Sequence, residues 1–157
     1  MTRDQRGLTL VEVTVAMVIA SLVMVGLVGF YLSSQMTWLS ASSQAVSQRE
    51  GTLALEVMSD QIRAAVSATV VNDPDANHQQ LTLTKVNGDP VVFQWNSTDS
   101  LIHWSDPADR GALINTRVTR FQVSENDTIV NIVGLDLLDP NGRTISFVGG
   151  AALYNRP

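Results

Sequence analysis

The sequence predicts an α+β protein in which one long helix is followed by an antiparallel β-sheet. The chain has 157 residues, of which 45% are hydrophobic and 16% are charged, but these averages hide a sharp change in composition. From residue 8 to residue 32, 19 of 25 residues are hydrophobic, whereas from residue 33 to residue 157 only 50 of 125 are. The periodicity also changes, because apolar residues recur every three or four positions between residues 55 and 69 and every second position after residue 80.

The first part of the helix is long and apolar enough to span a membrane. Val13–Leu32 contains no charged residue, and 20 helical residues at about 1.5 Å each cover a hydrocarbon layer roughly 30 Å thick. Arg3 and Arg6 precede it with a single Asp4, which predicts a cytoplasmic amino end and an extracytoplasmic remainder. A secretory signal would show small residues after its apolar core, but residues 30–32 are Phe-Tyr-Leu, so we expect the helix to be retained.

Glu12 is the one charged residue near the start of this apolar run. A carboxylate in such surroundings costs a few kcal/mol and is a functional candidate by default. The alternative is an interfacial glutamate that reaches headgroup water and favours the positive end of the helix dipole.

The residues around Glu12 resemble a known processing signal. Residues 6–13 read Arg-Gly-Leu-Thr-Leu-Val-Glu-Val, which is similar to the class III signal of type IV prepilins and type II secretion pseudopilins. The resemblance implies the pilin fold, cleavage by a membrane peptidase between Gly7 and Leu8, and methylation of the new amino terminus. Leu8 stands where that family usually has phenylalanine, so the first residue of the mature chain stays apolar.

Cleavage would place a new amine close to Glu12. After cleavage, we expect the amine of Leu8 and the carboxylate of Glu12 to stand at i and i+4, one helical turn apart on one face. Each is a costly charge at an apolar boundary, and pairing offsets both costs. In a filament, the amine of an incoming subunit would meet the Glu12 of a subunit already in place and set the axial register.

The helix is expected to continue well beyond the apolar run. No charged residue lies between Glu12 and Arg49, which indicates either a rod packed among other rods or an uncharged Ser/Gln-rich stalk. An amphipathic stripe then runs from Leu55 to Thr69. We expect helix from about Thr9 to Val70, with a bend allowed near Gly51, and a stop at residues 72–75, Asn-Asp-Pro-Asp.

The remaining chain reads as strands joined by turns. Asn87-Gly88 is a hairpin signal between two alternating segments. The six expected strands are residues 81–86, 91–95, 100–104, 118–123, 128–138 and 143–148. The predicted division of the chain is a cleaved leader (1–7), a transmembrane and assembly helix (8–32), an extracytoplasmic amphipathic helix (33–71) and a β-rich globular domain (72–157).

Two further segments are similar to minor subunits of these families. Residues 53–65 and 151–156 resemble the W-type minor pilins and the J-type minor pseudopilins. This resemblance implies an inner-membrane protein that primes assembly at the filament tip. The implied partners are prepilin peptidase, other minor and major pilins or pseudopilins, an inner-membrane assembly platform and the lipid bilayer.

The β-rich part offers few candidates for other chemistry, and we expect no enzyme activity and no cofactor. The chain has no cysteine, which excludes thiolate sites. Asp73 and Asp75 have the spacing that opens a calcium loop, but His78 and Thr84 replace its diagnostic Gly and Glu. A solvated turn is therefore favoured, and an irregular calcium site stays open. His78 and His103 have no nucleophile or second ligand at a recognisable spacing.

Two more predictions concern partners. From residue 33 onward, 8 basic and 13 acidic residues give a negative balance, which does not favour nucleic acid. Trp38, Trp95 and Trp104 are dispersed, so we expect them in the core or in subunit packing. The alternative to a filament subunit is a single-pass membrane-anchored extracytoplasmic binding protein or enzyme whose apolar helix is only a tether.

Overall fold

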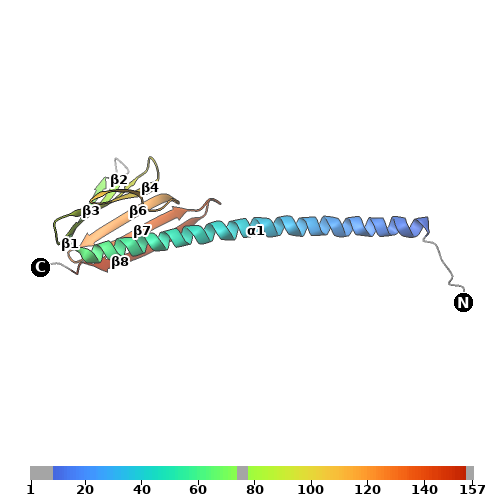
Figure 1. Cartoon of the computed structure of the whole chain (residues 1–157), viewed down its shortest axis with the longest axis horizontal. Helices are drawn as coiled ribbons and strands as arrows, with labels where there is room; N and C mark the ends of the chain where they lie inside the picture. Colours follow the sequence, from blue (N-terminus) through green and yellow to red (C-terminus); the bar gives the residue numbers. More distant parts are fainter. Residues whose placement is uncertain (1–8, 74–77, 155–157) are drawn as a thin grey trace. The chain divides into compact units, whose positions relative to one another are not determined.

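The computed structural model describes residues 9–73 and 78–154 and confirms the α+β class. A single helix, α1 (Leu10–Ala64), precedes the strands in this part of the chain (Figure 1). The strands are β1 (Ala65–Asp73), β2 (His78–Lys85), β3 (Pro90–Asn96), β4 (Leu101–Asp106), β5 (Ala108–Ala112), β6 (Arg117–Asn126), β7 (Ile129–Leu138) and β8 (Thr144–Ala152). The six strands expected from the sequence correspond to β2, β3, β4, β6, β7 and β8.

Helix α1 runs through two compact units, Met1–Ala41 and Ser42–Pro157. In the first unit, the side chains of the described helix are almost all exposed. In the second unit, one stripe of the helix is buried, formed by Ser47, Gly51, Ala54, Met58 and Ile62. Their spacing of three or four residues places them on one face. The helix is unbroken at Gly51, where the sequence allowed a bend.

The helix ends at Ala64 and not at Val70 as expected, and residues 65–73 form β1. Between residues 66 and 71, partly buried and exposed positions alternate, which is the period of a strand. Val66, Thr69, Val70 and Val71 are β-branched and favour this conformation. The strand also pairs antiparallel with β2 over its whole length, and this ladder outweighs the weak helical spacing. The β-rich region therefore starts at Ala65, earlier than the expected boundary at residue 72.

The strands form two antiparallel sheets rather than one. The five-stranded sheet has the order β1-β2-β3-β4-β5, and the three-stranded sheet has the order β6-β7-β8. The expected hairpin between β2 and β3 is confirmed, with Leu83 opposite Val91. Gly88 has a φ of 85° and donates its N–H to the Lys85 carbonyl oxygen at 2.9 Å, a conformation that glycine adopts without strain.

One hydrophobic core joins α1 to both sheets within the second unit. Met58 and Ile62 from the helix, Phe93 from β3 and Phe121 from β6 are at most 1% exposed. Gly51 lies against β8, because a Cβ at this position would come closer than 3.0 Å to the ring of Phe147. The aromatic ring thus takes the place that a side chain at position 51 would need.

The three tryptophans have different surroundings. Trp95 packs against the core and its Nε1–H donates to the Val118 carbonyl oxygen at 3.3 Å. Trp104 also packs against the core and stacks on Phe93, with ring centroids 5.9 Å apart. Trp38 lies in the first unit and is 71% exposed. Trp95 and Trp104 therefore have the expected core role, and the alternative of subunit packing stays a prediction for Trp38.

Candidate assembly and processing site

Glu12 lies in the first turn of α1, and Thr9 caps this turn. The Thr9 side-chain Oγ1 accepts a hydrogen bond from the Glu12 backbone N–H at 3.3 Å, and the Thr9 carbonyl oxygen accepts one from the Val13 N–H at 3.2 Å. Thr9 is therefore the N-cap residue, and Glu12 is the third helical residue. A Ser or Thr followed three positions later by Glu is a capping-box sequence, so the capping role of Thr9 was readable in the sequence but was missed.

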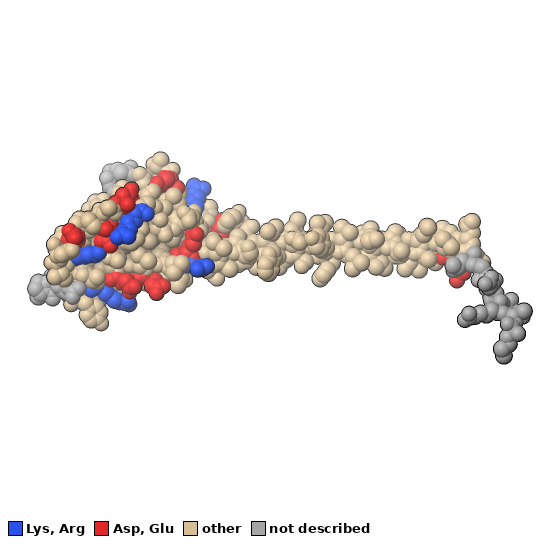
Figure 2. Space-filling view, viewed as in Figure 1, with Lys and Arg blue, Asp and Glu red and all other residues tan. Residues whose placement is uncertain are grey.

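The position of Glu12 favours a carboxylate. Its negative charge lies in the first turn, where four backbone N–H groups and the helix dipole create a partial positive charge. Beyond it, residues 13–48 carry no charge, and Figure 2 shows Lys, Arg, Asp and Glu gathered on the globular part instead. Within residues 9–48, all of which the structure describes, Glu12 is thus the one charged residue, and it is exposed.

Gly7 and Leu8, the expected cleavage pair, lie outside the described residues. The first helical residue is Leu10, so the described helix does not itself establish a helical i, i+4 relation between Leu8 and Glu12. The pairing of a Leu8 amine with Glu12 stays a prediction.

The apolar part of α1 has the properties of a membrane span. It contains a stretch that is long and apolar enough to cross a bilayer, by length and composition, and none of this stretch is buried inside the molecule. The hydroxyls of Thr14 and Ser21 donate to the carbonyl oxygens of Leu10 and Val18, at 2.6 and 2.7 Å. These side chains therefore have hydrogen-bond partners within the helix and need none from the surrounding medium.

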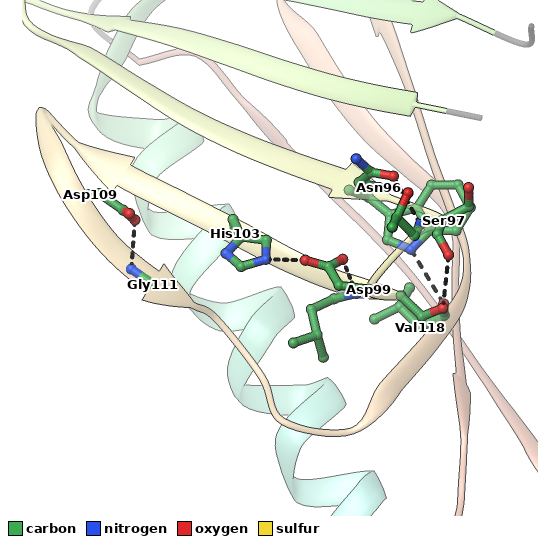
Figure 3. Close-up of polar contacts among 11 residues, drawn as sticks. Asn96, Ser97, Asp99, His103, Asp109, Gly111 and Val118 are labelled. Carbon is green, nitrogen blue, oxygen red and sulfur yellow. Dashed lines mark hydrogen bonds and ion pairs between the residues drawn. The ribbon is translucent and has the colours of Figure 1, made fainter. Parts of the chain in front are cut away.

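A second polar arrangement lies around His103 and Asp99 in the second unit (Ser42–Pro157), which we also call the globular unit. Nε2 of His103 contacts Oδ2 of Asp99 at 2.6 Å, and the Leu101 N–H donates to Oδ1 at 3.1 Å (Figure 3). The backbone N–H of Leu101 and then the imidazole stabilise the ionised carboxylate and lower the pKa of Asp99. The pair is more than 40% exposed, and it ties the turn before β4 to the strand itself. Ser100 in this turn has a φ of 58°, which is the left-handed backbone conformation that residues other than glycine rarely adopt.

The predicted calcium alternative cannot be placed in the described structure. Asp75 lies outside the described residues, as does the side chain of Asp73. Among the residues that the structure describes, no group of three or more His, Cys, Asp or Glu side chains is arranged to hold a metal ion.

The comparisons with known proteins concern the amino-terminal segment. Residues 2–28 match the family model described as the prokaryotic N-terminal methylation motif. This match supports a relationship to type IV pilin-like proteins. It covers 27 of 157 residues, and so it extends to neither the buried stripe of α1 nor the sheets. No curated protein and no solved structure matches the chain significantly.

Replacing Thr9 with Ala tests the cap. The Glu12 N–H loses its partner, and loss of an N-cap costs about 1 kcal/mol, so we expect its hydrogen exchange to accelerate roughly fivefold. Hydrogen–deuterium exchange of the full chain in detergent micelles measures this rate. Thr9→Ser keeps the hydroxyl and should exchange like the original chain. Equal exchange rates in the Ala and Ser variants would contradict the capping role.

Proposed function

We propose that the chain is a minor pilin or pseudopilin, a structural and assembly subunit of a type IV pilus or a type II secretion filament. The observation that carries the proposal is the methylation motif at residues 2–28, followed by an exposed apolar helix with Glu12 as its isolated charge. A helix that only tethers an enzyme must span the membrane, but it does not need a carboxylate at position 12.

In this proposal, prepilin peptidase cuts between Gly7 and Leu8 and the new amine is methylated. The amine of one subunit then pairs with Glu12 of a neighbour as subunits leave the inner membrane. An uncut leader would put Arg3 and Arg6 into this apolar contact, at a high desolvation cost. Cleavage therefore permits assembly. The amino end faces the cytoplasm, as the two arginines favour, and the globular domain lies outside it.

The minor-subunit assignment rests on the resemblance of residues 53–65 and 151–156 to minor subunits. Residues 53–65 include Ala54, Met58 and Ile62, which belong to the buried stripe of α1. Part of this similarity therefore concerns residues that pack α1 against the sheets. The proposed partners are other minor subunits, the major subunit and the inner-membrane assembly platform, and the proposed place is the filament tip.

The rival is an anchored extracytoplasmic binding protein or enzyme, which would keep residues 1–7. We expect coexpression with a prepilin peptidase to remove Met1–Gly7 and to add one methyl group to Leu8, and intact-mass spectrometry measures both changes. The same chain expressed without the peptidase is the control and should retain its leader. A full-length mass in the presence of active peptidase would overturn the proposal and favour the tether.

A further inference from the structure

Three polar or aromatic side chains share one face of α1 at the end of its apolar run and just beyond it. Tyr31, Gln35 and Trp38 are spaced by four and three residues, which places them in one row. The Gln35 side-chain Nε2 donates to the Tyr31 hydroxyl at 3.0 Å. Together with Ser34, they line a shallow depression on the helix surface. We name Tyr31, Gln35 and Trp38 the aromatic row.

The aromatic row is exposed and amphipathic. Tyr31 is 62% and Trp38 is 71% exposed, which is a large apolar area to leave in water. Each ring also carries one polar group, a hydroxyl or an indole N–H, and Gln35 carries an amide. Side chains of this kind suit the layer in which a bilayer changes from hydrocarbon to headgroups, because one end is apolar and the other end is wet.

The distance along the helix matches a bilayer. Tyr31 follows Glu12 by 19 positions and Trp38 by 26, which corresponds to about 29 Å and about 39 Å of helix. A bilayer has roughly 30 Å of hydrocarbon and about 40–45 Å including its headgroups. With Glu12 at one hydrocarbon boundary, Tyr31 therefore reaches the opposite edge of the hydrocarbon. Trp38 lies about 10 Å farther along the helix, whereas each headgroup layer is only about 5–8 Å deep. At the average helix tilt of about 20°, Trp38 comes to about 37 Å along the membrane normal, which is the outer part of the headgroup layer.

We propose that the aromatic row binds the lipid headgroup layer on the side of the membrane opposite to Glu12 and fixes the depth of α1. This inference rests on the membrane anchoring contained in the proposed function. It moves the outer limit of the membrane-contacting helix from Leu32 to Trp38, so that the polar residues 33–35 lie among headgroups and not in a stalk above them.

Brominated phospholipids test this depth. The full chain is reconstituted at low density into phosphatidylcholine vesicles that carry bromine either near the headgroups or near the bilayer centre. The fluorescence difference between the original chain and Trp38→Phe isolates Trp38. We expect shallow bromine to quench this difference signal about twofold more than deep bromine. Trp95 and Trp104, which remain in the variant, should respond to neither lipid.

The possible results distinguish the headgroup contact of the aromatic row from the membrane anchoring on which it rests. If the chain floats with the vesicles but the Trp38 signal is unquenched, or is quenched most by deep bromine, the headgroup contact is wrong and membrane anchoring stands. If the chain does not float with vesicles at all, both are wrong. Flotation is scored on the original chain, which carries the whole aromatic row, so the test of membrane anchoring does not depend on the Trp38→Phe variant.

Discussion

Glu12→Ala is expected to leave the chain cleaved and inserted in the membrane but to reduce its incorporation into filaments by roughly two to four orders of magnitude. The variant removes one partner of the proposed amine–carboxylate pair and leaves the Leu8 amine unpaired in apolar surroundings. Breaking a buried pair in this way costs about 3–5 kcal/mol. The amount of the chain in sheared filaments, relative to the amount in membranes, measures the effect.

Two further variants separate the charge from the helix cap. The backbone N–H of Glu12 makes the bond to Thr9, so the Ala variant keeps that bond and should keep the helix start. Glu12→Gln retains a polar side chain without the charge and should lose incorporation, whereas Glu12→Asp should retain part of it. Normal incorporation of the Ala or Gln variant would show that the pairing argument is wrong for this chain.

The parts of the fold that depend on local patterns were predictable from the sequence. The apolar run, the uncharged surface and the amphipathic stripe predicted one long helix, although its expected end at Val70 was six residues too late. Asn87-Gly88 predicted the β2–β3 hairpin. The isolated charge of Glu12 also stood out without a structure. In each of these cases, the residues that carry the signal are neighbours in the chain or lie one helical turn apart.

The parts that were missed depend on tertiary contacts or lack a pattern. Residues 65–70 fit a weak helical stripe and a weak alternation equally well, and pairing with β2 decides between them. Strand β5 contains Asp109, Arg110 and Gly111 and shows no alternation of apolar residues. The close contact between Gly51 and the ring of Phe147 joins residues far apart in the sequence. No residue near Gly51 in the sequence indicates this contact.

A contact between residues far apart in the sequence also lies where the chain passes between the two sheets. Oε2 of Glu50 in α1 accepts hydrogen bonds from the backbone N–H groups of Asn115 and Thr116, at 3.2 and 2.7 Å. These residues lie between β5 and β6, where the chain passes from one sheet to the other. The helix therefore contacts this crossing through the carboxylate of Glu50. The sequence showed Glu50 only as the first acidic residue after a long uncharged surface.

Ile62→Ala is expected to lower the free energy of unfolding of the globular unit by about 2–5 kcal/mol. Ile62 is 0% exposed and belongs to the core that joins α1 to both sheets. Truncation to alanine therefore leaves a cavity that the helix and the sheets cannot easily fill. Small domains have only about 5–15 kcal/mol of stability. Denaturant unfolding of the full chain in detergent micelles, followed by tryptophan fluorescence, measures the change.

A graded series on the same helix shows whether the loss arises from the buried stripe. Ile62→Val removes one methylene and should cost about 0.5–1.5 kcal/mol, between the original chain and the Ala variant. Leu53→Ala truncates a residue that is 47% exposed and should cost less than about 1 kcal/mol, because its surroundings are already partly solvent. If Leu53→Ala were as costly as Ile62→Ala, the exposed face would also be packed, and the buried stripe would not be what attaches α1 to the sheets.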